Sequence, residues 1–201
     1  MKKRIMKIAL ASAMVVGLVA FPGAVSADEI TDSINEALTQ YKNNDYAAAS
    51  ESLSYALQLL GQKKGVQLQE LLPKPLPGWT ADEASSETIN AAIMGGGINA
   101  ERRYQRDNSS VTVKFTTDSP MLQGMMMMFS NPMFATADGG KLEKIKGQKA
   151  IIKFNSRNNS GTITIVVGNR TLILIEGNSV NQEDLKNYAA AIDYQKLSTL
   201  P

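Results

Sequence analysis

Two apolar runs joined by Gly168-Asn169 constrain the fold of this chain more than any other part of its sequence. A two-residue Gly-Asn loop is typical of a tight β-hairpin, in which residues at equal distances from the loop face each other. The expected pairs are Val167 with Arg170, Ile165 with Leu172, and Ile163 with Leu174. This register predicts one strongly apolar, buried face and a second face on which threonines accompany the apolar residues.

Four further stretches are apolar or alternate between polar and apolar residues, and each predicts a strand. With the hairpin, the predicted strands are 98–106, 110–117, 141–146, 149–155, 162–167 and 171–176. Helices are expected over 85–94, from about residue 121, and from about residue 181. The last helix should bury Leu185, Tyr188, Ala189 and Ile192. This order predicts an α+β domain with a mostly antiparallel six-stranded meander sheet and helices on its face or faces.

Residues 31–60 carry apolar side chains at helical spacing and predict a helical hairpin. Lys42-Asn43-Asn44 makes the turn, Asp45 caps the second helix and Gly61 ends it. The apolar faces consist of Ile34, Ala37, Leu38 and Tyr41 on the first helix and Ala49, Leu53, Ala56, Leu57 and Leu60 on the second.

Part of this hairpin resembles the second half of a tetratricopeptide (TPR) repeat. The resemblance rests on Asn44-Asp45-Tyr46, Ala49, Leu53, Ala56-Leu57 and Leu59. It covers about one repeat, whereas a solenoid needs roughly three or more repeats to bury its faces. It therefore implies one TPR-like hairpin that packs on the rest of the chain or on another chain. A generic amphipathic hairpin is the alternative.

Residues 1–27 have the three parts of a secretory signal peptide. Basic residues at positions 2, 3, 4 and 7 precede an apolar run, and Val25-Ser26-Ala27 supplies the small residues for cleavage. The run is shorter than the roughly 20 residues of a membrane-spanning helix. We therefore expect cleavage after Ala27, no stable membrane span afterwards, and an exported product that is periplasmic or secreted. An uncleaved N-terminal anchor is the alternative.

The remaining chain divides into a TPR-like hairpin (28–72), a proline-rich linker (73–79) and an α+β sandwich (80–201). Prolines at 73, 75 and 77 stiffen the linker, which ends at Trp79. Trp79 is either an anchor that docks the linker on the core or an exposed platform for a ligand. An anchor is favoured because large aromatic side chains bury well.

Charge and composition exclude several classes of function. The leader holds four of the 21 basic residues and none of the 19 acidic ones, which leaves 17 basic and 19 acidic residues and a net charge of −2. Such a chain lacks the basic surface of a nucleic-acid-binding protein. With no His and no Cys, it also lacks the usual nucleophile systems, thiol redox chemistry and nearly all zinc sites. We expect a non-enzymatic protein with no catalytic residues and no cofactor.

The acidic doublets and the glycine run have structural interpretations. Asp82-Glu83 and Glu183-Asp184 fall where helices are expected to start, and acids there interact favourably with the helix dipole. The glycines at 95–97 lack the Lys of a phosphate-binding loop. They are typical of a helix stop that leads into a strand.

Six of the ten methionines lie between residues 121 and 133, and three interpretations compete. The segment is a core helix with Met121, Met125 and Met128 facing the sheet; or an adaptable surface for a lipid, a peptide or a partner protein; or a Cu(I) or Ag(I) site. The surface would consist of Met125, Met126, Met127, Met128, Phe129, Met133 and Trp79. The metal ligands would come from Met121, Met125, Met126, Met128 and Met133.

Two further resemblances concern the larger part of the chain. The order of its elements resembles the PsbP-type αβα sandwich, and residues 76–84 and 119–134 resemble a family of small exported bacterial proteins of unknown function. These imply a fold and a compartment without an activity. We predict an exported binding or accessory module that acts on another periplasmic protein or a hydrophobic ligand. Soft-metal binding is the alternative, and an enzyme of unrecognised type comes third.

Overall fold

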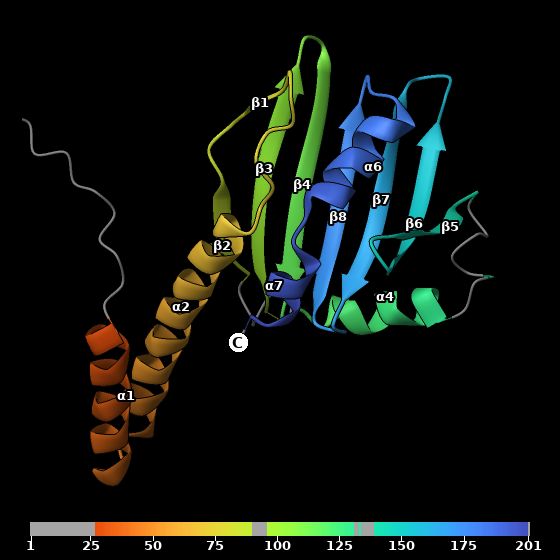
Figure 1. Ribbon diagram of the computed structural model, residues 1–201. Helices are drawn as coiled ribbons and strands as arrows, with labels where there is room; N and C mark the ends of the chain where they lie inside the picture. The colour runs from red at the N-terminus through yellow and green to blue at the C-terminus, as the bar shows by residue number, and fades with distance from the viewer. Residues whose placement is uncertain (1–26, 90–95, 131–132, 134–138, 201) are drawn as a thin grey trace, which may run out of the picture.

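The computed structural model describes residues 27–89, 96–130, 133 and 139–200 (Figure 1). Helices α1 Ala27–Lys42 and α2 Tyr46–Glu70 form a hairpin that extends away from an eight-stranded sheet. Helices α6 Gln182–Ala191 and α7 Tyr194–Ser198 lie on one face of this sheet. The predicted α+β class is confirmed. Apart from Ala27, the predicted leader lies outside the described residues.

The sheet is antiparallel throughout, in the order β1-β3-β4-β8-β7-β6-β5, and β2 also pairs with β3. The strands are β1 Thr80–Ala81, β2 Ser85–Thr88, β3 Ile98–Arg106, β4 Ser109–Thr117, β5 Lys141–Ile145, β6 Gln148–Asn155, β7 Ser160–Val167 and β8 Thr171–Asn178. The six predicted strands correspond to β3 to β8. The four last strands form a meander, and the β3–β4 hairpin joins it through β8.

The helix predicted over 85–94 is wrong where the structure describes it. Residues 85–88 form β2 along the outer edge of β3, with Ser85 opposite Glu101 and Thr88 opposite Ile98. The edge of β3 offers unpaired backbone groups, and these outweigh a weak local helix preference. Asp82-Glu83 consequently lies in a loop instead of a helix start, and the Asp82 carboxylate accepts a hydrogen bond from the Gln105 amide at 3.2 Å.

The predicted register of the β7–β8 hairpin is wrong by one residue. The turn forms as expected, with positive φ at Gly168 and Asn169 and a 3.2 Å hydrogen bond from Arg170 N–H to Val167 O. Arg170 is then an extra residue, so Val167 faces Thr171. The Thr117 hydroxyl, at the end of β4, donates to the Arg170 carbonyl at 3.0 Å and holds this bulge.

The shifted register exchanges the two faces of β8, because side chains alternate along a strand. Ile173 and Ile175, expected on the mixed face, lie in the main core opposite Ile165 and Ile163. Leu172 and Leu174, expected in the core, lie on the other face. Helix α6 covers the core face as predicted, since Leu185, Tyr188 and Ala189 of the helix and Ile192 directly after it are buried. Asn181 and Asp184 cap its start with reciprocal hydrogen bonds.

Helix α2 begins as predicted and continues past its predicted end. The Asp45 carboxylate accepts a hydrogen bond from Ala48 N–H at 3.1 Å. Gly61, predicted to end the helix, lies within it because the helix packs across β2. A Cβ atom on Gly61 would lie 2.7 Å from Thr88 Oγ1, and one on Gly65 would lie 2.7 Å from Ser86 Oγ. These glycines allow α2 to approach β2 closely. The residues that follow them include Leu68 and Leu72, which lie in the core of the sheet domain.

The linker is fixed to the sheet at several points. The Tyr104 hydroxyl donates to the Pro73 carbonyl at 2.6 Å. Trp79 is 7% exposed, packs edge-on against Tyr188 with ring centroids 5.4 Å apart, and lies beneath the Arg106 guanidinium at 4.4 Å. Arg106 in turn donates to both oxygens of Asp184. Burial raises the pKa of Tyr188 to about 12, so this ring remains neutral in the core. Trp79 is therefore an anchor.

Candidate functional site

The predicted apolar faces of the hairpin separate into a buried set and an exposed set. The small residues Ala37, Ala49 and Ala56 are buried between α1 and α2. They let the two helices approach closely, and the Ser33 hydroxyl donates across the contact to the Ser52 carbonyl at 2.8 Å. The large residues remain in solvent. They are Ile34, Leu38 and Tyr41 on α1 and Leu53, Leu57 and Leu60 on α2; Tyr46, the first residue of α2, was not on a predicted face and is exposed beside them.

These seven side chains, here named the hairpin face, lie on one side of the hairpin. At about 100° per residue, the exposed side chains of α1 lie about a quarter turn around that helix from its line of contact with α2, and the exposed side chains of α2 lie about a quarter turn from the same line. Because α1 and α2 run in opposite directions, the two quarter turns lead to the same side. At the tip, the rings of Tyr41 and Tyr46 have centroids 5.8 Å apart and join the two sets. Exposure ranges from 41% for Leu60 to 67% for Leu57.

The hairpin face is uncharged. The acidic residues Glu29, Asp32 and Glu36 occupy positions on the opposite side of α1. Lys64, one turn after Leu60, marks the end of the face next to the sheet, where its ammonium pairs with Asp118 at 2.6 Å. An extended surface of this kind can bind apolar surface on another molecule.

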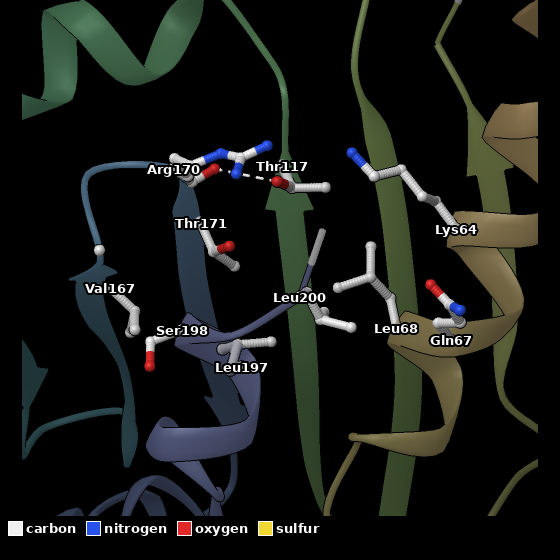
Figure 2. Close-up of a pocket in the computed structure, with 11 residues that line it drawn as sticks. Lys64, Gln67, Leu68, Thr117, Val167, Arg170, Thr171, Leu197, Ser198 and Leu200 are labelled. Atoms are coloured by element: carbon white, nitrogen blue, oxygen red, sulfur yellow. Dashed lines mark hydrogen bonds between the residues drawn. The ribbon is translucent and has the colours of Figure 1, made fainter.

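A small pocket lies where the last turns of α2 meet the sheet, beyond the end of the hairpin face (Figure 2). Leu68 of α2 and Leu197 and Leu200 near the C-terminus line it, while Lys64 and Arg170 lie at its rim. The pocket is shallow and partly open to solvent. Both cations already interact with Asp118, which lies 3.4 Å from the Arg170 guanidinium. The pocket can accept a short apolar group, and it continues the apolar surface of α2.

Asp118 links α2 to the β7–β8 turn, and this link predicts a dependence of stability on pH. Burial tends to raise the pKa of Asp118, but hydrogen bonds and charges from Lys64 and Arg170 outweigh it and lower the pKa. The ionised carboxylate therefore stabilises the fold above its ordinary pKa, and this contribution disappears as the pH falls through the lowered value. Asp118→Asn should lower stability at neutral pH by about 0.2–1 kcal/mol, the range of solvent-exposed pairs.

Urea unfolding of both proteins at neutral pH and at about pH 3, below the ordinary Asp pKa, measures this effect. The difference between wild type and Asp118→Asn should shrink at the lower pH. An equal difference at the two pH values would show that the charge of Asp118 is not responsible.

Helix α4 Met121–Ser130 carries most of the methionine segment and lies beyond the end of the sheet, beside the β7–β8 turn (Figures 1 and 2). Among the described side chains of this helix, Leu122 is buried, and our interpretation of the methionine pattern missed it. Met125, Met126 and Phe129 are half-buried, and Met133 is 72% exposed. The side chains of Met121, Met127 and Met128 lie outside the described residues. The soft-metal hypothesis, which needs several of these sulfurs to converge, stays a prediction.

The structure does not bring the predicted surface residues together. Trp79 adjoins the end of β3 near Arg106, whereas α4 follows the opposite end of the sheet, after Asp118. The sequence predicted that the hairpin packs on the rest of the chain or on another chain, and within the described residues the rest of the chain does not cover the hairpin face. The signal for its exposure is the alternation of alanine with large apolar residues, which places one small and one large side chain in each turn.

Comparisons with protein-family models, curated proteins and solved structures found no match. The resemblances to a TPR repeat, to a PsbP-type sandwich and to small exported bacterial proteins therefore stay predictions. Within the described residues, no helix has both the length and the apolar composition to span a bilayer. Nor do three carboxylates in that part of the chain gather into a site for a metal ion.

Proposed function

We propose that this chain is an exported, non-catalytic binding or accessory module, and that it works by docking the hairpin face onto another polypeptide. The observation that carries the proposal is the exposure of seven large apolar side chains on one side of α1 and α2. Together they leave on the order of 700 Å² open to solvent, whereas the largest patch on an ordinary monomer is roughly 300–600 Å². A larger patch is typical of a protein interface.

The shape of the hairpin face favours a polypeptide over a small hydrophobic ligand. Small ligands bind in concave sites that bury most of their surface. The hairpin face is instead the outer surface of two adjacent helices, with its side chains spread from the tip at Tyr41 to Leu60. Such a surface fits apolar, uncharged helices that lie along it.

The position of the predicted cleavage site supports export of an intact module. Cleavage after Ala27 would remove the leader and leave residues 28–42 of α1, with their contact to α2, in place. The absence of His and Cys from the sequence supports a role in binding over the common types of catalysis.

The absence of Cys also makes single-cysteine labelling a direct test. Leu57→Cys places a thiol in the hairpin face, and Val66→Cys places one on the other side of the same helix, where Val66 is 53% exposed. In intact cells, a maleimide that cannot cross the inner membrane should label Leu57→Cys about tenfold more slowly than Val66→Cys, because labelling follows the uncovered population.

Equal labelling of the two cysteines would contradict a docking function. If neither cysteine reacts until the cells are lysed, the chain is not exported, and the ratio measured in the lysate then decides whether the hairpin face is covered.

A further inference from the structure

We infer that the polypeptide on the hairpin face is a second copy of this chain, and that two hairpins close into a four-helix bundle. The inference rests on the proposed function, because it names the partner of the same surface. It follows from the spacing of the apolar residues, their charge, their area and the position of the hairpin relative to the sheet.

The spacing is that of helices in a bundle. On α1 the apolar positions are Ile30, Ile34, Ala37 and Tyr41, and on α2 they are Tyr46, Ala49, Leu53, Ala56 and Leu60. Successive positions are three or four residues apart, as in the a and d positions of a heptad repeat. In a four-helix bundle the side chains at the a positions and at the d positions all point inward. Here one set, including Ala37, Ala49 and Ala56, is buried within the hairpin, while the other set is exposed. The hairpin is therefore half of such a core.

Charge favours an identical partner. In a two-fold dimer the same surface patch meets itself, so a charge near its centre would meet a like charge. No charged residue lies near the centre of the hairpin face; Lys64, which pairs with Asp118, lies at one end, and the exposed Lys42, one turn after Leu38, lies at the other. A partner of different sequence is usually selected by complementary charges around an apolar centre. The acidic side chains of α1 instead lie away from the face.

The size and position of the hairpin face also fit a dimer. Its exposed surface, on the order of 700 Å², is close to the roughly 800 Å² that each partner buries in a specific interface. Figure 1 shows the tip of the hairpin standing clear of the sheet. Two hairpins that pack in opposite directions would therefore place their sheets at opposite ends of the bundle.

This arrangement puts Leu53 near the two-fold axis. Leu53 lies seven residues from both Tyr46 and Leu60, about 10 Å along the helix from each end of the face on α2. The same residue in the second copy should lie close to it, whereas Val66 should lie far from its counterpart.

Sedimentation equilibrium of the purified mature chain, beginning at Asp28, tests the inference. Wild type should have twice the mass of a single chain. Leu53→Glu should weaken the dimer by about 100-fold or more, because an unpaired charge is buried at the contact. Val66→Glu, which adds the same charge to the same helix, should remain dimeric. Circular dichroism of both variants establishes that they fold.

A second measurement does not depend on the folding of a charged variant. On mild oxidation, Leu53→Cys should form a disulfide-linked dimer and Val66→Cys should not. A wild-type chain that is monomeric at the highest soluble concentration would overturn the inference. If Leu57→Cys is nevertheless protected in cells, docking stands with a different partner. If it is not protected, the proposed function fails as well.

Discussion

Ile173→Ala is expected to lower the free energy of unfolding by about 2–5 kcal/mol, the usual range for truncating a core side chain. Ile173 is 0% exposed, and it lies between Phe115 of β4 and Ile165 of β7. Its removal leaves a cavity that rigid strands on both sides cannot close. Urea unfolding monitored by the fluorescence of the single tryptophan, which is buried in the fold, measures the loss.

Leu174→Ala is the matched control, because it truncates a side chain of the same size as Ile173 at the next residue of β8. Leu174 is half-buried on the other face of β8, between Lys114 and Thr164. Its truncation should cost about 1 kcal/mol, since partial burial contributes only part of the transfer free energy. A larger loss at Leu174 than at Ile173 would support the two-residue loop predicted from the sequence and contradict the bulge at Arg170.

The β7–β8 hairpin shows how far local sequence determines structure. Gly168-Asn169 predicted the turn correctly because the required backbone angles depend on these two residues. The register depends also on Arg170, whose carbonyl is held by the Thr117 hydroxyl. That contact joins residues far apart in the sequence, and no pattern within the hairpin encodes it. One extra residue was sufficient to exchange the two faces of β8.

The helix ends and strand β2 show the same limit. The cap at Asp45 and the capping pair of Asn181 and Asp184 were predictable, because each involves residues within one turn. The end of α2 was not, because Gly61 permits contact with β2 instead of ending the helix. Strand β2 itself forms because β3 offers an edge, and its own sequence favours no strand strongly.

The sequence predicted most residues of the candidate site but not which of them the chain itself covers. Periodicity identified apolar positions in two predicted helices, and these positions lie on α1 and α2 of the observed hairpin. Periodicity does not reveal which neighbour covers each position. The alanines meet the adjacent helix, and the large residues meet no part of the described chain that buries them. Attention to residue size within each turn would have separated the two sets.

Trp79→Ala should also have a large effect, lowering the free energy of unfolding by about 3–5 kcal/mol. The indole contributes more than its buried area, because it packs on Tyr188 and lies beneath the Arg106 guanidinium at 4.4 Å. Without it, Arg106 keeps its bond to Asp184 but loses its aromatic support. Because the variant has no tryptophan, circular dichroism during urea unfolding is the appropriate measurement.

Lys74→Ala provides the control, since Lys74 lies in the same linker with an exposed side chain. It should change stability by less than about 0.5 kcal/mol, as surface substitutions usually do. The comparison of Trp79→Ala with Lys74→Ala is informative because this linker connects α2 to the sheet. Because Trp79 is the anchor, its loss should weaken both the attachment of the hairpin and the core of the sheet domain. The hairpin and the sheet domain should then unfold in a single transition with a lower free energy of unfolding. A loss below about 1 kcal/mol, far under the range for a buried aromatic, would mean that Leu68 and Leu72 hold the hairpin on the sheet without it.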